Sequence, residues 1–218
     1  MMGSSISRNS IMLGLFAIMT TALIAGTYLG TRDMIVEAQR KAQEKALLEI
    51  IPDERHDNSM LDDTLPIGPE ATGLRLSASQ QIFIARQQEN VVAVILPVTA
   101  PDGYSGAIDM IVGINSDGSI AGVRVLTHKE TPGLGDKVDL NKSDWILSFD
   151  GTSLRNPMPE QWKVKKDKGY FDQFTGATIT PRAVTAAIKR SLEYFQANQQ
   201  TLLAPLRAAP VGEENSDG

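Results

Sequence analysis

The chain has 218 residues, of which 42% are hydrophobic and 22% are charged, so it can form one sizeable domain together with additional segments. It contains no cysteine, which excludes disulfides, thiol nucleophiles and cysteine-ligated metal sites. Its formal net charge of −5 argues against nucleic acid as a partner, because phosphate binding depends on clustered Lys and Arg.

The first element is a long apolar segment. No charged residue lies between Arg8 and Arg32, and a helix over residues 11–30 is long enough to cross the hydrocarbon core of a membrane. A short tail, residues 1–10, precedes it. A cleaved signal peptide is the alternative, but residues 22–26 match a cleavage site poorly. We therefore expect an uncleaved single-span transmembrane anchor at residues 11–30.

Residues 31–90 are expected to form a juxtamembrane helix followed by a loop. Small and apolar side chains recur along one face of residues 31–51, and Pro52 ends this pattern. The acidic and polar residues 53–69 favour a loop with some local structure. This region is therefore interpreted as a connection between the anchor and the main domain.

Runs of apolar and β-branched residues predict the strands that follow. Three such runs lie at residues 91–99, 108–114 and 120–126. The second and third are joined through an Asp-Gly turn, which is typical of a hairpin. Residues 145–149 and 161–164 are shorter strand candidates or packing segments.

A helical pattern at residues 181–197 closes the domain. Four apolar residues spaced four, four and three apart form one face that can be buried. The order of helix, strands and helix, without βαβ units, indicates an α+β fold. We expect an N-terminal transmembrane helix, then a mostly antiparallel sheet with flanking helices. The main domain is expected at residues 91–200, and residues 201–218 are expected to form a polar tail.

The ten residues 172–181, with the letters DQFTGATITP, combine a turn with the start of this helix. Thr180 suits the N-cap position and Pro181 suits the first helical position. Thr178 then lies two residues before the cap, near backbone N–H groups and a helix dipole that favour a phosphate. The same pattern is also that of a helix-capping turn without a ligand.

The letters Asp-x-x-Thr-Gly-Ala-Thr in this segment resemble the flavinylation signature of the FMN-binding domain family. That family includes the G subunit of the Rnf (Rsx) electron-transport complex and the C subunit of the sodium-pumping NADH:quinone reductase. The resemblance implies that Thr178 carries FMN through a phosphoester bond to its hydroxyl. Asp172 and Thr175 are then recognition or turn-forming residues, while Gly176 and Ala177 leave room for close approach.

A second motif, Glu-Thr-Pro-Gly-Leu-Gly, lies at residues 130–135. Its proline and two glycines predict a tight, preformed loop, which by itself is compatible with any turn. The FMN-binding domain family has the same letters in a loop that lines the isoalloxazine ring, and residues 102–106 resemble the family's upstream glycine-rich turn. By that resemblance, the residues that contact or orient the flavin are Glu130, Thr131, Leu134 and Gly135.

The two motifs and the anchor together imply a function. The short chain is more similar in length to the Rnf G subunit than to the longer C subunit of the reductase. The resemblance implies a membrane-anchored electron relay in a complex that couples electron transfer to ion translocation, not a complete enzyme. Its partners would be the other membrane subunits of the Rnf (Rsx) complex. A separate flavin transferase would attach FMN, because no histidine adjoins Thr178 in sequence.

The sequence leaves location and function with alternatives. The Lys and Arg count mildly favours a cytoplasmic domain, whereas the resemblance implies the bacterial inner membrane with the large domain in the periplasm, and we follow the resemblance. A membrane-anchored ligand-binding module without a redox role would share the same anchor, sheet and turns. A hydrolase using Ser105 or Thr178 with His128, and an assembly protein that has lost the flavin, are further alternatives.

Overall fold

The computed structural model describes residues 2–204, with side chains for residues 8–204. The chain divides into two units, Met1–Lys45 and Ala46–Gly218, and each is described by itself. Residues 205–218, which belong to the expected polar tail, lie outside the described residues.

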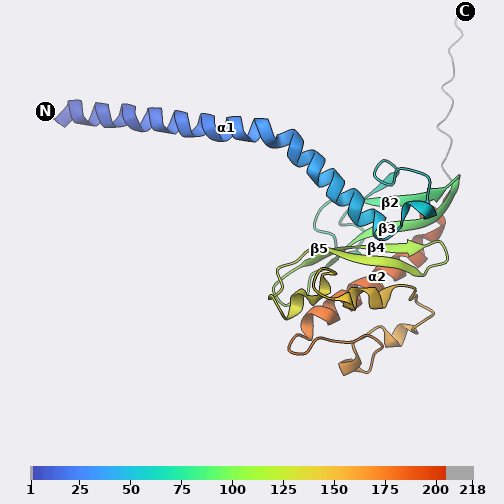
Figure 1. The fold of residues 1–218 in the computed structure, drawn as a ribbon. Helices are drawn as coiled ribbons and strands as arrows, with labels where there is room; N and C mark the ends of the chain where they lie inside the picture. The colour runs from blue at the N-terminus through green and yellow to red at the C-terminus, as the bar shows by residue number, and fades with distance from the viewer. Residues whose placement is uncertain (1, 205–218) are drawn as a thin grey trace, which may run out of the picture. The chain divides into compact units, whose positions relative to one another are not determined.

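Helix α1 (Met2–Leu48) forms most of the first unit (Figure 1). The apolar side chains between Arg8 and Arg32 are exposed. By length and composition this helix can cross a membrane, and it is the one helix of that kind in the described part of the chain. Residues 2–10 of the expected short tail and residues 31–48 of the expected juxtamembrane helix are parts of the same continuous helix as the anchor.

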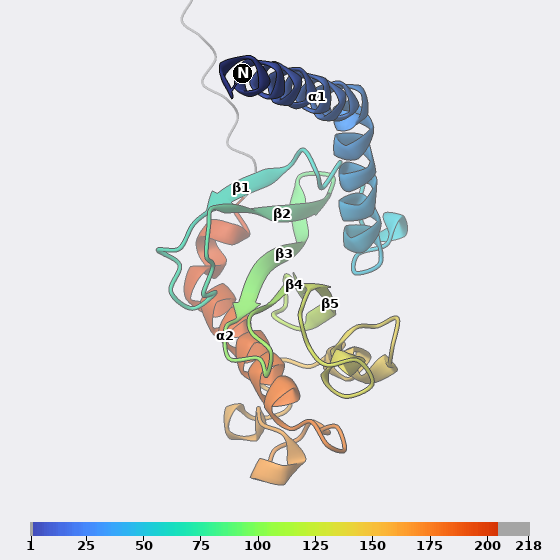
Figure 2. The same cartoon turned by 90° about the vertical axis from the view of Figure 1, so that its left-hand side faces the viewer.

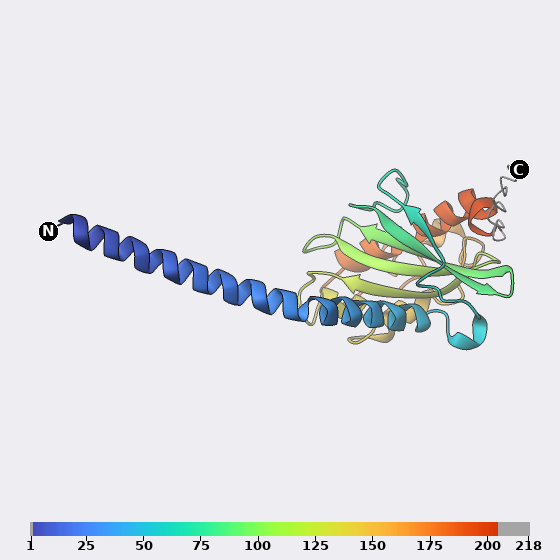
Figure 3. The ribbon, with the colours of Figure 1, turned by 90° about the horizontal axis from the view of Figure 1, so that it is seen from above.

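The second unit is built on a five-stranded antiparallel sheet in which strands consecutive in sequence are neighbours (Figure 3). The strands are β1 (Thr64–Ile67), β2 (Gln80–Gln87), β3 (Asn90–Ala100), β4 (Ile108–Asn115) and β5 (Ile120–Thr127). The last three lie where the sequence predicts strands, and β4 and β5 form the predicted hairpin. The predicted α+β fold is confirmed.

Strands β1 and β2 lie in the region expected to be a loop. Because β2 pairs with β3 from Phe83 to Gln87, the compact unit includes residues before 91, and the expected boundary at that residue falls inside the sheet. Strand β1 has only four residues and contains Pro66, while glutamines flank the short buried run of β2. Neither strand has enough alternation to be recognised from sequence.

Helix α2 (Ile179–Leu202) covers one face of the sheet (Figures 1 and 2). The buried face of this helix is the predicted one, and its largest apolar residues are Val184, Ile188, Leu192 and Phe195. The helix also includes residues 201 and 202, which the sequence placed in the tail, because Leu202 is buried in the core. Alternate residues along the strands contribute to the same apolar core as α2, which lies mainly against β3 and β4.

The other face of the sheet is covered by the end of α1 and the turn that follows. Leu47, Ile50 and Ile51 are buried there against strand residues that alternate with those under α2. These strand residues are Phe83, Ala85, Ala93, Ile95 and Ile111. The sheet thus lies between two apolar layers.

The segment between β5 and α2 contains short 3₁₀ helices. One of them, Asp144–Phe149, covers the strand candidate at residues 145–149, and another, Pro159–Gln161, meets the start of the candidate at residues 161–164. These candidates are packing segments and not strands. Their aromatic rings pack together, with Phe149 stacked on Phe171 at 4.3 Å between ring centroids and Trp145 edge-on to Phe149. The rings belong to the same buried cluster as Ala183 and Val184 near the start of α2. Figure 2 shows the segment that carries them (yellow to orange) at the end of the unit where α2 begins.

Two glycines facing each other across β4 and β5 allow Ile50 to lie against the sheet. Gly113 pairs with Gly122, and a Cβ placed on Gly113 would lie 2.2 Å from Ile50 Cγ2. A side chain at position 113 is therefore incompatible with the position of Ile50. The turn after α1 packs on the sheet because this glycine leaves the space open.

We predict that Gly113→Ala lowers the free energy of unfolding by about 1–3 kcal/mol, because the added methyl overpacks this contact. Urea unfolding of the full chain in detergent measures the change. In an Ile50→Ala background, which removes the clashing Cγ2 atom, the same substitution should cost much less. Equal costs in the two backgrounds would contradict the packing argument.

Candidate functional site

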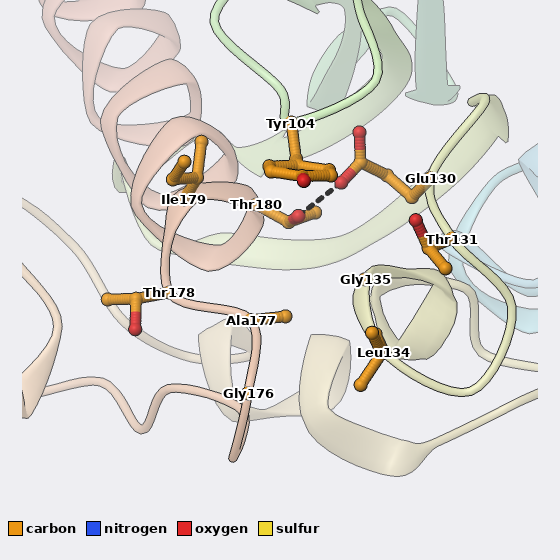
Figure 4. Close-up of a pocket in the computed structure, with 10 residues that line it drawn as sticks. All are labelled: Tyr104, Glu130, Thr131, Leu134, Gly135, Gly176, Ala177, Thr178, Ile179 and Thr180. Atoms are coloured by element: carbon orange, nitrogen blue, oxygen red, sulfur yellow. Dashed lines mark hydrogen bonds between the residues drawn. The ribbon is translucent and has the colours of Figure 1, made fainter.

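An open cavity of about 310 Å³ lies beside the first turn of α2, between three segments that are far apart in the sequence (Figure 4). This volume is at the lower end of the range typical of ligand pockets. The residues that line the cavity are Tyr104, Glu130, Thr131, Leu134, Gly135, Gly176, Ala177, Thr178, Ile179 and Thr180. The cavity therefore brings together the two motifs and the turn at residues 102–106.

The loop at residues 131–135 is a closed turn. The backbone N–H groups of Leu134 and Gly135 both donate to the carbonyl oxygen of Thr131, at 3.1 and 3.2 Å. Gly133 has a φ of +78°, a conformation that glycine adopts without strain. This turn directs the half-exposed Leu134 side chain toward Gly176, where an added Cβ would lie 3.4 Å from Leu134 Cδ2. Gly176 thus keeps the cavity open on this side.

Glu130 joins the three segments. It is only 5% exposed, and its Oε1 accepts a hydrogen bond of 2.8 Å from the backbone N–H of Ser105. Its Oε2 accepts a hydrogen bond from the hydroxyl of Thr180, a fully buried residue (Figure 4). A buried carboxylate is stable only when such donors replace water. These bonds fix the turn, the loop and the helix start relative to one another.

The start of α2 differs from the prediction. The helix begins at Ile179, so Thr180 lies in the first turn and its expected role as the N-cap is wrong. Its hydroxyl instead donates a hydrogen bond to Glu130. Thr178 occupies the N-cap position, although its side chain makes no capping hydrogen bond. Pro181 still lies in the first turn, where the helix needs no N–H.

Thr178 lies at the edge of the cavity. Its side chain is partly buried, and Figure 4 shows it on the opposite side of the chain from Ala177. Gly176, with a φ of +83°, precedes these two residues in a turn closed by the hydrogen bond from the Ala177 N–H to the Phe174 carbonyl. Thr178 is therefore followed toward the opposite wall of the cavity by two residues with little or no side chain, Ala177 and Gly176.

Two of the predicted site residues do not line the cavity. The carboxylate of Asp172 is exposed and pairs with Lys165 at 2.7 Å, while its backbone carbonyl accepts a hydrogen bond from the Trp145 indole. Thr175 is exposed in the turn before Gly176. Both residues therefore belong to the turn that leads to Thr178 and not to the cavity wall.

An ion pair ties the first turn of α2 to the segment before it. The Arg182 guanidinium donates two hydrogen bonds to Asp167 and holds the pKa of that carboxyl below its usual value. The same interaction raises the pKa of Arg182. The pair is partly exposed, so water weakens its contribution.

The arrangement does not supply hydrolase chemistry. His128 Nδ1 accepts the backbone N–H of Glu130 at 3.2 Å. Within residues 8–204, no hydrogen bond joins His128 to Ser105 or Thr178, so the pairing of base and hydroxyl that this alternative requires is not formed. The same residues contain no group of three or more His, Asp or Glu side chains placed to hold a metal ion.

Three residues that line the cavity were not among the predicted site residues: Tyr104, Ile179 and Thr180. Tyr104 is in the glycine-rich turn that the sequence singled out, but nothing in a single sequence indicates which way this ring points. Ile179 and Thr180 follow Thr178 directly, and the shift in helix start brings them to the cavity.

Comparison with known proteins covers both units. The FMN-binding domain family matches residues 103–193, a range that includes every residue lining the cavity. The family described as RnfG N-terminal region matches residues 1–50. The G subunit of the ion-translocating oxidoreductase complex of Pseudomonas aeruginosa (strain UCBPP-PA14) is 50% identical over 206 residues, covering 94% of this chain and 95% of that protein.

The chain belongs to the family of G subunits of ion-translocating oxidoreductase complexes.

Other members of this G-subunit family agree along nearly the whole chain. The protein of Shewanella loihica (strain ATCC BAA-1088 / PV-4) is 48% identical and covers 93% of this chain and 95% of its own length. That of Vibrio cholerae serotype O1 (strain M66-2) is 41% identical, with 91% and 94% covered. A crystal structure of the C subunit of the Na⁺-translocating NADH-quinone reductase from Parabacteroides distasonis has a TM-score of 0.44 and 17% identity, covering 73% of this chain and 94% of that one.

We predict that Gly135→Ala destabilises the site. Its added methyl would lie 2.6 Å from Glu130 Oε2 and 2.8 Å from the Thr180 hydroxyl, so it would break the hydrogen bond between them. Loss of a buried hydrogen bond costs about 1–3 kcal/mol, measurable by urea unfolding. Gly73→Ala is the matched control, because its added methyl meets only ordinary contacts, at 3.7 Å and beyond. A similar cost in both variants would contradict this account.

Proposed function

We propose that this chain is a membrane-anchored flavoprotein subunit that carries FMN on the Thr178 hydroxyl and relays electrons within an ion-translocating oxidoreductase complex. The observation that carries the proposal is the cavity beside Thr178, which lies inside the range matched by the FMN-binding domain family. Membership in the G-subunit family supports the assignment to such a complex.

Thr178 is a better attachment point than its neighbouring threonines. The hydroxyl of Thr180 is fully buried and donates to Glu130. Thr175 is exposed and does not line the cavity. Thr178 is partly exposed, lines the cavity and makes no capping bond. Of the three, only Thr178 combines an accessible hydroxyl with a place at the cavity.

The start of α2 suits a phosphate on Thr178. The first turn of a helix leaves backbone N–H groups unpaired, and the dipole of a helix of 24 residues favours negative charge there. The N–H groups of Ile179 and Thr180 are the nearest in sequence to the proposed phosphoester. Leu134, Gly176 and Ala177 would then form the walls between which the flavin ring is held.

Attachment would require a separate enzyme. A threonine hydroxyl is a weak nucleophile without a neighbouring base, and His128 makes no hydrogen bond with Thr178 within residues 8–204. We propose that a flavin transferase makes the bond and recognises the exposed turn that contains Asp172 and Thr175.

A covalent tether fits an electron relay. FMN, when bound, supplies one- and two-electron transfer. A tethered cofactor stays at high local concentration, so the cavity need not enclose it to retain it. An open cavity therefore leaves an edge of the ring accessible to electron-transfer partners.

We propose that α1 anchors the domain among the other membrane subunits of the Rnf (Rsx) complex and that the domain lies in the periplasm of a bacterial inner membrane. Residues 11–30 carry no ionisable charge, and ion pathways in membranes are generally marked by such groups. The ion path would therefore run through the other subunits.

We predict that the full chain, produced together with a flavin transferase, is yellow after denaturation and heavier by one FMN residue. Thr178→Ala should remove both the colour and the mass increase, because it removes the attachment oxygen. Visible spectra and intact-mass measurement report the two effects. Thr175→Ala, which changes an exposed hydroxyl nearby, should still carry the cofactor. A colourless wild-type chain of unmodified mass would favour the ligand-binding module without a redox role.

The proposed periplasmic location of the domain leads to a further prediction. Alkaline phosphatase fused after Gly218 should be active, because this reporter folds only after export to the periplasm. Green fluorescent protein fused at the same place should be dark, because it does not fold when exported in unfolded form. The opposite pair of results would place the domain in the cytoplasm, as the Lys and Arg count favours.

A further inference from the structure

We propose that the Tyr104 ring is an aromatic wall that contacts the isoalloxazine, and that Glu130 is a positioning residue that holds this ring at the cavity. The inference rests on the proposed function, because it concerns how the same cavity would hold FMN. It assigns to Tyr104 a role that its sequence motif does not indicate.

Tyr104 has a ring that is free to receive a ligand. It is 68% exposed although it lines the cavity, and Figure 4 shows it beside Glu130 and Thr180, across the cavity from Leu134. Aromatic rings gain about 0.5–1.5 kcal/mol from ring–ring contact beyond the area that they bury. A flat aromatic ligand in this cavity would cover an exposed phenol, which otherwise remains in water.

The turn that carries Tyr104 is held in one shape by its glycines. A Cβ on Gly103 would lie 2.2 Å from the carbonyl oxygen of Gly106, so the turn is too tight for a side chain there. Gly106 has a φ of +127°, which other residues rarely adopt. The ring is therefore presented by a preformed turn.

Glu130 fixes this turn to the cavity. Its Oε1 accepts the N–H of Ser105, the residue after Tyr104, and its Oε2 accepts the Thr180 hydroxyl. Both carboxylate oxygens thus already have protein donors. Glu130 would therefore act on the flavin through the position of Tyr104 and of the α2 start, and not through direct contact.

The test is the fluorescence of FMN in the fully loaded chain. A phenol in contact with a flavin quenches its fluorescence, because it donates an electron to the excited ring and then takes it back. Tyr104→Phe keeps the shape of the ring but is a much poorer electron donor, so fluorescence per bound FMN should rise several-fold. Tyr104→Trp should restore the quenching. Tyr170→Phe changes an exposed tyrosine outside the cavity and is the matched control.

The role of Glu130 is tested with two variants. Glu130→Ala removes both acceptors and should release the turn, so fluorescence should rise as it does in Tyr104→Phe. Glu130→Gln keeps an acceptor oxygen for Ser105 and should retain the quenching, and circular dichroism checks that each variant is folded. If Glu130→Ala does not fold, Glu130→Gln decides. A rise in FMN fluorescence in Glu130→Gln equal to that in Tyr104→Phe would overturn the positioning role.

The outcomes separate the inference from the proposed function. Intact mass measured on each sample shows whether FMN is attached. Absence of FMN from the wild-type chain would refute the proposed function itself. Normal FMN content with unchanged fluorescence in Tyr104→Phe would overturn the aromatic wall alone. Normal content with a several-fold rise in Tyr104→Phe and no rise in Tyr170→Phe is the result that we expect.

Discussion

The hydrogen bonds accepted by the Glu130 carboxylate are the interaction on which the cavity depends. A buried carboxylate loses its water, so its oxygens must find donors within the protein. Here the donors come from Ser105 and Thr180, which are 25 and 50 residues away in sequence. Gly135 makes this meeting sterically possible, because a side chain there would collide with both Glu130 and Thr180. Three segments that are far apart in the sequence thus become one site.

The parts of the fold that follow from local patterns could be predicted from the sequence. Strands β3 to β5 have long apolar runs, the Asp-Gly turn marks their hairpin, and α2 has a clear apolar face. Strands β1 and β2 could not be recognised in this way, because one is four residues long and the other is flanked by glutamines. They are strands because β2 pairs with β3 and β1 pairs with β2, which satisfies their backbone groups, and this pairing is not visible in the local sequence.

The site shows the same division between local and distant causes. The motif letters were enough to bring Thr178, Gly176 and Leu134 to attention, and the structure places all three at one cavity. The N-cap prediction for Thr180 failed because α2 begins at Ile179, and the Thr180 hydroxyl instead donates to Glu130, far away in the chain. Tyr104 could not be found from sequence, since the bond between Ser105 and Glu130, which joins its turn to the cavity, links residues 25 positions apart.

The simple order of the sheet also has a consequence for how the site matures. All five strands pair with their neighbours in sequence, so the sheet can form from contacts that are close along the chain. Helix α2 follows all of them, and the bond between Thr180 and Glu130 closes only when this last helix docks. The cavity is therefore complete only when α2 is docked, and a maturation enzyme that requires the finished cavity would discriminate native chains from those in which α2 is undocked.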